Sequence, residues 1–176
     1  MSTIPDTPQL ILWRHAEAED LSPFSASRCT PARRKADMER ELTKRGRAQA
    51  RRVAGWLRER LPKGTKVLAS PALRCVETAR ALTRDFVEVA GLGPEHDCAD
   101  LLAAIGWPEL TGTVVLVGHQ PTLGRVTAMM LTGREADWNV KKGAVWWFER
   151  RLRGHHAEHV LRAVMAPDLA KNLAKK

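Results

Sequence analysis

The run Thr113–Val117 constrains the fold of this chain more than any other segment. It reads Thr-Val-Val-Leu-Val, without a charge and rich in β-branched residues, which is the pattern of a strand buried on both faces of a sheet. Short apolar runs also occur at Gln9–Trp13, Val67–Ala69 and Phe86–Val89, and helical patterns separate them. This alternation predicts one α/β domain over residues 1–176, a three-layer sandwich whose mostly parallel sheet has helices on both faces and an antiparallel edge strand.

The helices and the remaining strands are predicted from caps and periodicity. Thr43 can cap a helix that runs to about Leu61, because apolar residues recur there at helical spacing. Ser70 is a natural N-cap for the next helix, with Pro71 at its first position. Further helices are expected over 98–105 and 121–131, and strands over 144–152 and 159–164 that pair as a hairpin around Gly154.

Two segments do not fit this alternation. Residues 18–41 form a polar excursion, long for a connection in a compact domain, which we interpret either as a flap or as a basic surface for a partner protein. Residues 170–176 are expected to be a flexible tail.

The positive charge of the chain is unevenly distributed. The net charge is +9 at pH 7, and residues 28–60 alone hold twelve Lys or Arg against four Asp or Glu. Such a stretch attracts nucleic acid or an acidic partner, or is simply a solvated helix face. We do not expect nucleic-acid binding, because no aromatic residue interleaves with these charges before Trp56.

Cysteine usage and the N-terminus indicate the compartment. Cys29, Cys75 and Cys98 are odd in number and widely spaced, which favours a reducing environment. The first apolar stretch is about five residues long and follows Asp6, too short for a signal peptide or a membrane span. We expect a cytoplasmic protein that does not contact a membrane and is a monomer or a weak dimer.

Three of the predicted strands end at residues that suit an anion site. His15, Ser70 and His119 each follow a separate strand, and Arg74 lies in the first turn of the helix after Ser70. The carboxyl ends of parallel strands converge on one edge of a sheet, so these side chains and Arg14 can meet there. A pocket with two arginines and two imidazoles suggests a phosphoryl group as its ligand.

Four motifs in this order resemble the histidine phosphatase superfamily, also called phosphoglycerate-mutase-like. They are Arg14-His15-Ala16, Leu42-Thr43-x-x-Gly46, Ser70-Pro71-Ala72-Leu73-Arg74 with Glu77-Thr78-Ala79, and Val117-Gly118-His119-Gln120-Pro121. The short chain and the closing Met165-Ala166-Pro167-Asp168-Leu169 are more similar to the SixA-type phosphohistidine phosphatases than to the larger mutases.

The resemblance implies a role for each matching residue. His15 is implied to be the nucleophile, which takes the phosphoryl group onto a ring nitrogen and yields it to water without a metal or cofactor. Attack needs a neutral imidazole, and nearby arginines disfavour its protonation. Arg14, Arg74 and His119 are implied to bind the phosphoryl group, and Arg40 aligns with a further basic residue of SixA-like pockets.

The general acid is where the chain departs from the broader family. Members usually carry a glutamate after the third strand, and here that region offers only Glu95 and Asp97 as candidates, without the family's surrounding residues. An alkoxide leaving group gains about 10²- to 10⁴-fold from an acid, whereas a phosphohistidine imidazole leaves once it is protonated near neutral pH. The expected function is therefore removal of phosphate from phosphohistidine in a protein.

Two alternatives to that function stay open. One is a phosphomonoesterase of the same fold that acts on small phosphorylated substrates with Glu95 or Asp97 as its acid. The other is a binding module for phospho-ligands or nucleic acid that has no turnover.

Three further motifs have simpler interpretations. The run 155–159, His-His-Ala-Glu-His, lacks the order of a zinc helix, so we expect a hairpin and no metal site. Trp146-Trp147-Phe148 alternates along a strand, which predicts core packing for at least one ring. Lys141-Lys142-Gly143 is either a polar turn or a source of positive charge at the pocket mouth, where Lys142 would bind substrate.

Overall fold

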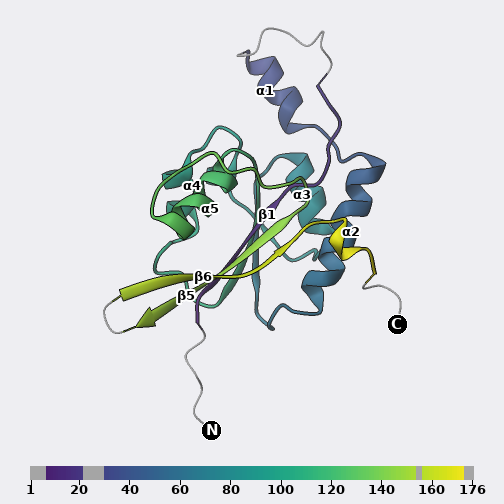
Figure 1. Ribbon diagram of the computed structural model, residues 1–176. Helices are drawn as coiled ribbons and strands as arrows, with labels where there is room; N and C mark the ends of the chain where they lie inside the picture. The colour runs from purple at the N-terminus through teal and green to yellow at the C-terminus, as the bar shows by residue number, and fades with distance from the viewer. Residues whose placement is uncertain (1–6, 22–29, 154–155, 173–176) are drawn as a thin grey trace.

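The computed structural model describes residues 7–21, 30–153 and 156–172 of the chain. Within these ranges a central sheet lies between two layers of helices, as Figure 1 shows. The strands are β1 (Gln9–Arg14), β2 (Lys66–Ala69), β3 (Val87–Glu88), β4 (Thr113–Gly118), β5 (Val145–Arg153) and β6 (His156–Met165). The helices are α1 (Pro31–Met38), α2 (Lys44–Arg58), α3 (Leu73–Arg80), α4 (Cys98–Ala104) and α5 (Thr122–Thr132), with short 3-10 turns η1 (Ala90–Leu92) and η2 (Leu169–Asn172).

The strand order β3-β2-β4-β1-β5-β6 confirms the predicted sheet class. Strands β1 to β4 are parallel, with β1 and β2 each paired to β4, and β5 is antiparallel to β1. The antiparallel strand lies one place inside the edge, because β6 pairs outside it to form the expected hairpin. The central position of β4 explains its composition, since all six of its residues are buried.

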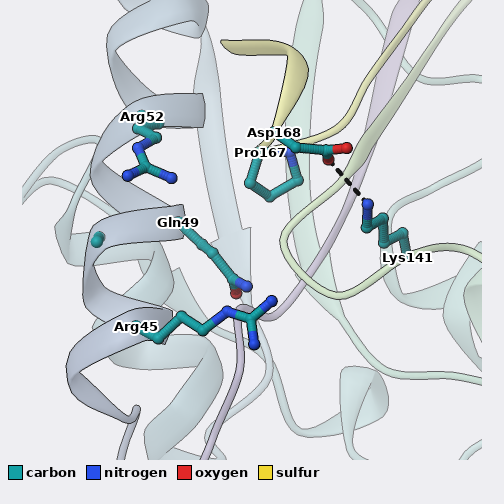
Figure 2. A pocket seen from close by; sticks show the side chains of 7 residues that line it. Arg45, Gln49, Arg52, Lys141, Pro167 and Asp168 are labelled. Atoms are coloured by element: carbon teal, nitrogen blue, oxygen red, sulfur yellow. Dashed lines mark hydrogen bonds and ion pairs between the residues drawn. The ribbon is translucent and has the colours of Figure 1, made fainter. Parts of the chain in front are cut away.

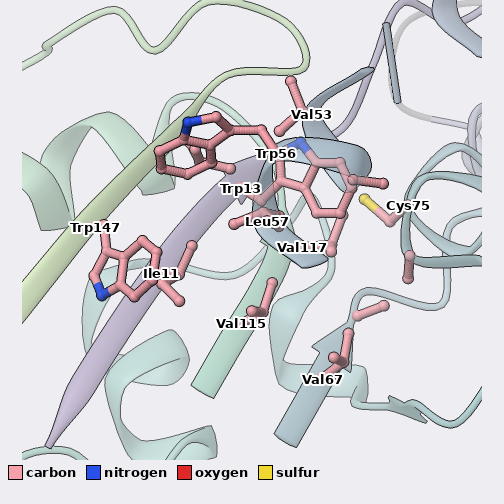
Figure 3. Packing of buried hydrophobic residues seen from close by; sticks show 14 of the residues in the cluster. Ile11, Trp13, Val53, Trp56, Leu57, Val67, Cys75, Val115, Val117 and Trp147 are labelled. Atoms are coloured by element: carbon pink, nitrogen blue, oxygen red, sulfur yellow. The ribbon is translucent and has the colours of Figure 1, made fainter. Parts of the chain in front are cut away.

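Alternation along β1 builds a hydrophobic core on each face of the sheet. Ile11 and Trp13 pack on one side with residues of α2 and α3, as Figure 3 shows for Val53 and Leu57. Leu10 and Leu12 point to the other side and pack with α4 and α5. Helices therefore cover both faces, and the prediction of three layers is correct.

The aromatic run on β5 packs into both cores, as its alternation predicts. Trp147 joins the first core, where its ring meets that of Trp56 edge-on with the centroids 6.0 Å apart. Phe148 is fully buried in the second core. Trp146 is half-buried against that second core. Core packing therefore accounts for Trp147 and Phe148, as the alternation predicts.

Of the two helix caps predicted at Thr43 and Ser70, the structure has the first and not the second. Thr43 caps α2 as expected, and its side chain accepts a hydrogen bond from the backbone N–H of Gly46 at 2.8 Å. The prediction that Ser70 caps the next helix is wrong, because α3 begins at Leu73 after Ala72. The hydroxyl of Ser70 instead forms a hydrogen bond with the imidazole of His119.

The excursion over 18–41 contains a helix that periodicity did not reveal. Thr30 caps α1 through a bond from the N–H of Arg33, and no residue of α1 is buried. Figure 1 shows α1 above the body of the molecule, on the same side as the carboxyl end of β1. A short β-bridge between Ala18 and Leu42 closes the excursion at its base. A helix without a buried face does not need apolar residues at helical spacing, which explains why the sequence pattern did not predict α1.

The first part of the predicted tail packs against the domain. Ala170 is 4% exposed and packs in the first core, so the chain is ordered against the domain through η2. Only residues 173–176 of the predicted tail lie outside the described residues. In the part of the chain that the structure describes, no helix combines the length and the apolarity that crossing a membrane requires.

Candidate active site

The residues predicted at three strand ends meet in one pocket. Its volume is about 310 Å³, and it lies where β1 and β4 end. The pocket brings together all six residues expected to be catalytic or substrate-binding: Arg14, His15, Arg40, Arg74, His119 and Lys142. Parallel pairing explains the convergence, because Arg14 at the end of β1 is in register with Gly118 at the end of β4.

His15 is held in one tautomer by the backbone. The side chain is 7% exposed, and its Nδ1 lies 2.7 Å from the carbonyl oxygen of Ala16. A carbonyl only accepts hydrogen bonds, so Nδ1 carries the proton and donates it. The lone pair of this imidazole is therefore on Nε2, the nitrogen that remains for nucleophilic attack.

His119 is held in the opposite tautomer. Its Nδ1 lies 3.3 Å from Nη2 of Arg74, and a guanidinium only donates, so Nδ1 accepts. Its Nε2 then carries the proton and lies 2.8 Å from the hydroxyl oxygen of Ser70. The two imidazole rings are neighbours, with centroids 5.3 Å apart.

Burial keeps both imidazoles neutral. The pKa of His15 is lowered to about 3, mainly by desolvation and further by the positive charges of Arg74, Arg14 and Arg40. The pKa of His119 is lowered to about 2, again mainly by desolvation and then by Arg74. The arginines lower the pKa of both imidazoles as expected, but removal from water is the larger cause.

Arg74 is a buried cation whose side chain bonds Asp37 of α1 and His119, which follows β4. Its residue is 2% exposed on the first turn of α3. Nη1 donates to the backbone carbonyl of Asp37 at 2.5 Å, and Nη2 donates to the Asp37 carboxylate at 2.9 Å. The same carboxylate accepts from Nε of Arg40 at 2.9 Å. Asp37 thus joins α1 to two of the pocket cations.

Asp37 is the site residue that sequence reasoning missed. It lines the pocket with His15, and its place three residues before Arg40 was the one available signal, since such a pair meets on a helical turn. Four cations and this one carboxylate line the pocket, so the site stays strongly positive.

The turn before β5 is a polar turn, and it also contributes a cation to the lining of the pocket. Gly143 has a φ of +74°, which favours glycine, and its N–H donates to the carbonyls of Arg14 and His15. Lys142 lines the catalytic pocket, whereas Lys141 pairs with Asp168 at 2.9 Å outside it. The turn therefore fixes the end of β1 and places one ammonium group at the pocket mouth.

Residues of the remaining motifs hold the segment after His15 in place. Thr78 accepts from the N–H of Ala16 at 3.1 Å and donates to the carbonyl of Arg74 at 2.7 Å. Gly46 lies so close to Glu17 that a Cβ there would collide with the Glu17 carbonyl oxygen. Thr78 and Gly46 thus hold the backbone that follows His15, and they do not belong to the lining of the pocket.

The two candidate acids lie outside the catalytic pocket. Asp97 is exposed and caps α4 by accepting from the N–H of Asp100 at 3.0 Å. Glu95 is exposed and lines a neighbouring hollow beside α1. The pocket residues themselves include one carboxylate, that of Asp37.

The histidine-rich run 155–159 is part of the hairpin. His156 to His159 belong to β6, and His155 lies outside the described residues. His159 bonds the carbonyl of Met130 at 3.2 Å and packs against the ring of Trp107. Among the residues that the structure describes, no three His, Cys, Asp or Glu side chains are grouped as a metal site would require.

Comparison with known proteins identifies relatives of this chain. Residues 10–92 match the model of the histidine phosphatase superfamily, branch 1. A Mycobacterium leprae protein, ML1117, which is described as uncharacterized, is 35% identical over 103 residues, a match that covers 56% of this chain and 62% of that protein. The matched part is thus less than two thirds of that relative's length.

Solved structures of the same fold extend over nearly the whole chain. A SixA protein from Agrobacterium tumefaciens matches with a TM-score of 0.68 at 22% identity, covering 92% of this chain and 99% of that one. The protein histidine phosphatase SixA complexed with tungstate matches at 0.64 and 23% identity, covering 91% and 97%. A mycobacterial glucosyl-3-phosphoglycerate phosphatase matches at 0.60 and 19% identity, covering 88% and 97%. At these identities the likeness concerns the fold.

Proposed function

We propose that this chain, whose residues 10–92 match the histidine phosphatase superfamily model and whose fold is that of SixA proteins, is a phosphatase that passes the phosphoryl group through His15 without a metal ion. The observation that carries this proposal is the neutral, buried imidazole of His15, with Nε2 unprotonated, in a pocket lined by four cations. A neutral nitrogen can attack phosphorus, and the cations attract the phosphoryl group to it.

The reaction has two steps at phosphorus. In the first, the Nε2 lone pair of His15 forms a bond to phosphorus, and the bond to the leaving group breaks with its electron pair. In the second, water attacks the same phosphorus, the bond to His15 breaks with its electron pair returning to Nε2, and both water protons leave with the inorganic phosphate. The imidazole recovers its Nε2 lone pair and is ready for another turnover.

The cations stabilise the phosphoryl group in flight. Arg14, Arg74 and Lys142 would contact the three equatorial oxygens, over which the negative charge of the transition state is spread. The orientation of the two arginines is fixed before substrate arrives, because Arg14 donates to the carbonyl of Val140 at 2.6 Å and Arg74 is held by Asp37. Groups that are already oriented stabilise charge without a reorganisation cost.

We further propose that the substrate is phosphohistidine in a protein. Both carboxylate oxygens of Asp37 accept hydrogen bonds from guanidinium groups, so Asp37 is placed as an acceptor and not as a proton donor. A pocket without a positioned acid favours a P–N bond, whose imidazole leaving group is protonated from solution near neutral pH. The fold of SixA, a protein histidine phosphatase, agrees with this choice.

A small-molecule phosphomonoesterase is the second candidate. The fold similarity to glucosyl-3-phosphoglycerate phosphatase favours it, as does the hollow near Glu95 that adjoins the pocket. It requires an acid, so Glu95→Gln or Asp97→Asn would then lower turnover of sugar phosphates about 10²-fold or more. Unchanged turnover of phosphoramidate by both variants supports the phosphohistidine substrate.

The proposal includes a cytoplasmic location and a monomeric or weakly dimeric state. The substrate protein and the phosphatase would meet in the cytoplasm, where thiols stay reduced, and Cys75 and Cys98 are buried free thiols. Cys29 lies outside the described residues. The phosphatase would act as a monomer or a weak dimer.

Trapping the intermediate tests the proposal. The protein is mixed briefly with ³²P-labelled phosphohistidine substrate, quenched in alkali and examined for label that is stable in base and lost in acid. We expect such label on the wild type and on His156→Ala, whose histidine is exposed on β6. We expect none on His15→Ala, together with loss of turnover. Label or turnover that survives in His15→Ala contradicts the proposed nucleophile, and binding without any turnover by the wild type favours a non-catalytic module.

A further inference from the structure

The outward face of α2 carries cations that the catalytic pocket does not use. Lys44, Arg45, Arg51 and Arg52 are exposed, and positions seven apart lie on the same side of a helix. Arg45 pairs with Glu17 at 3.6 Å, yet its side chain is 78% exposed. Among the described residues, Lys44, Arg51 and Arg52 form no ion pair. Most of the charge on this face is therefore directed to solvent.

A hollow of about 140 Å³ lies beside these cations. Figure 2 shows Arg45 and Arg52 on α2, across the hollow from Pro167 and from the ion pair of Lys141 with Asp168. We call this surface, formed by Lys44, Arg45, Arg51, Arg52 and Lys141, the basic face.

The basic face adjoins the catalytic pocket. Gln49, which lines the hollow, accepts from the backbone N–H of Glu17 at 3.0 Å, two residues after His15. Lys141 lines the hollow, and its neighbour Lys142 lines the catalytic pocket. A molecule that covers the basic face therefore reaches the mouth of the pocket.

The arrangement fits the surface of a protein better than a compact anion. Arg45 and Arg52 are two helical turns apart, roughly 10 Å along the axis, farther than one phosphate can bridge. Glu17 and Asp168 lie next to the cations, so a small anion would also meet carboxylates. A single-stranded nucleic acid would gain from stacking its bases on aromatic rings, but none of the residues that line the hollow is aromatic.

We propose that the basic face docks an acidic surface on the protein that carries the phosphohistidine, and so delivers this residue to His15. The proposal rests on the proposed function and adds how the substrate protein is recognised. Exposed charges of this kind act mostly on the association rate, because they steer an oppositely charged partner during encounter. Their contribution weakens as salt screens it.

The test compares one double variant with a matched control on two substrates. Arg45→Gln with Arg52→Gln removes two charges from the basic face, and Lys63→Gln with Lys66→Gln removes two exposed charges at the opposite edge of the sheet, where β2 begins. The substrates are a histidine-phosphorylated phosphotransfer domain of negative net charge and phosphoramidate. Binding of the labelled unphosphorylated domain is followed by fluorescence anisotropy, which does not depend on turnover.

We expect the arginine variant to lose roughly tenfold in kcat/KM on the domain at low salt. Its activity on phosphoramidate should equal that of the wild type, the control variant should match the wild type on both substrates, and the difference should shrink with added salt. Wild-type affinity for the domain in the arginine variant overturns the docking proposal, as does an equal loss on both substrates. Tighter binding of duplex DNA than of the domain, lost in the same variant, also overturns it. Failure of the wild type to hydrolyse either substrate refutes the proposed function instead.

Discussion

Replacing Arg74 by alanine gives the sharpest test of how the pocket works. The residue is 2% exposed and connects the carboxylate of Asp37 with the imidazole of His119. Alanine removes the guanidinium group while Asp37 keeps its ion pair with Arg40 at 2.9 Å. The substitution therefore removes one of the proposed phosphoryl-binding groups and leaves the ion pair of Asp37 with Arg40 in place.

The expected loss follows from the position of this charge. Removing one oriented donor from a developing oxyanion costs about 2.7–4 kcal/mol, which is a fall of roughly 10²- to 10³-fold in kcat. The variant also loses a positive charge that lowers the pKa of His15, but desolvation is the larger cause of that shift. The nucleophile should stay neutral at pH 7, so the loss should be the same at pH 6.5 and pH 8.

The assay is steady-state hydrolysis of phosphoramidate, with urea unfolding to confirm that the variant is folded. Arg80→Ala removes an exposed cation from the last residue of the same helix and should match the wild type. A loss of less than tenfold in a folded Arg74 variant would refute the assigned role. A loss that disappears at high pH would show that Arg74 acts through the protonation of His15.

Three further predictions follow from the same geometry. The free energy of unfolding should fall below pH 6.5, because folding lowers the pKa of His15 from 6.5 to about 3 and that of His119 to about 2, so the unfolded chain binds more protons. The loss is on the order of 1 kcal/mol per histidine at pH 5.5. Urea unfolding should show about half of this loss in His119→Gln. Asp37→Asn should lower kcat/KM about tenfold, because a neutral amide holds Arg74 and Arg40 less firmly; a rise would show that Asp37 competes with the phosphoryl group. EDTA should leave phosphoramidate hydrolysis unchanged, and inhibition restored by added metal would contradict the metal-independent route.

Periodicity and composition were sufficient for the sheet and most helices. The uncharged run Thr113–Val117 lies at the centre of the sheet, and the cap at Thr43 is where the sequence places it. Such signals are local, because burial and capping leave a pattern in neighbouring residues. Helix α1 left no such pattern, since none of its residues is buried.

The residues of the site also include some that the sequence pattern predicts and some that it does not. His15 and His119 could be predicted because they follow strands that end at one edge of a parallel sheet. Ser70 was assigned to a helix cap from its local context, whereas the structure pairs it with His119, 49 residues away. No local rule predicts a bond of that separation.

By itself, therefore, the sequence determined the order of the strands and of every α-helix except α1, together with the chemical type of each residue at the strand ends. Only the tertiary structure decided that Asp37 bridges two pocket cations, that Glu95 and Asp97 stay outside the pocket, and that opposite nitrogens of the two imidazoles carry the proton. The physical reason is that strand and helix patterns depend on neighbours in the chain. Ion pairs, tautomers and desolvation depend on neighbours in space, which the packing of distant segments creates.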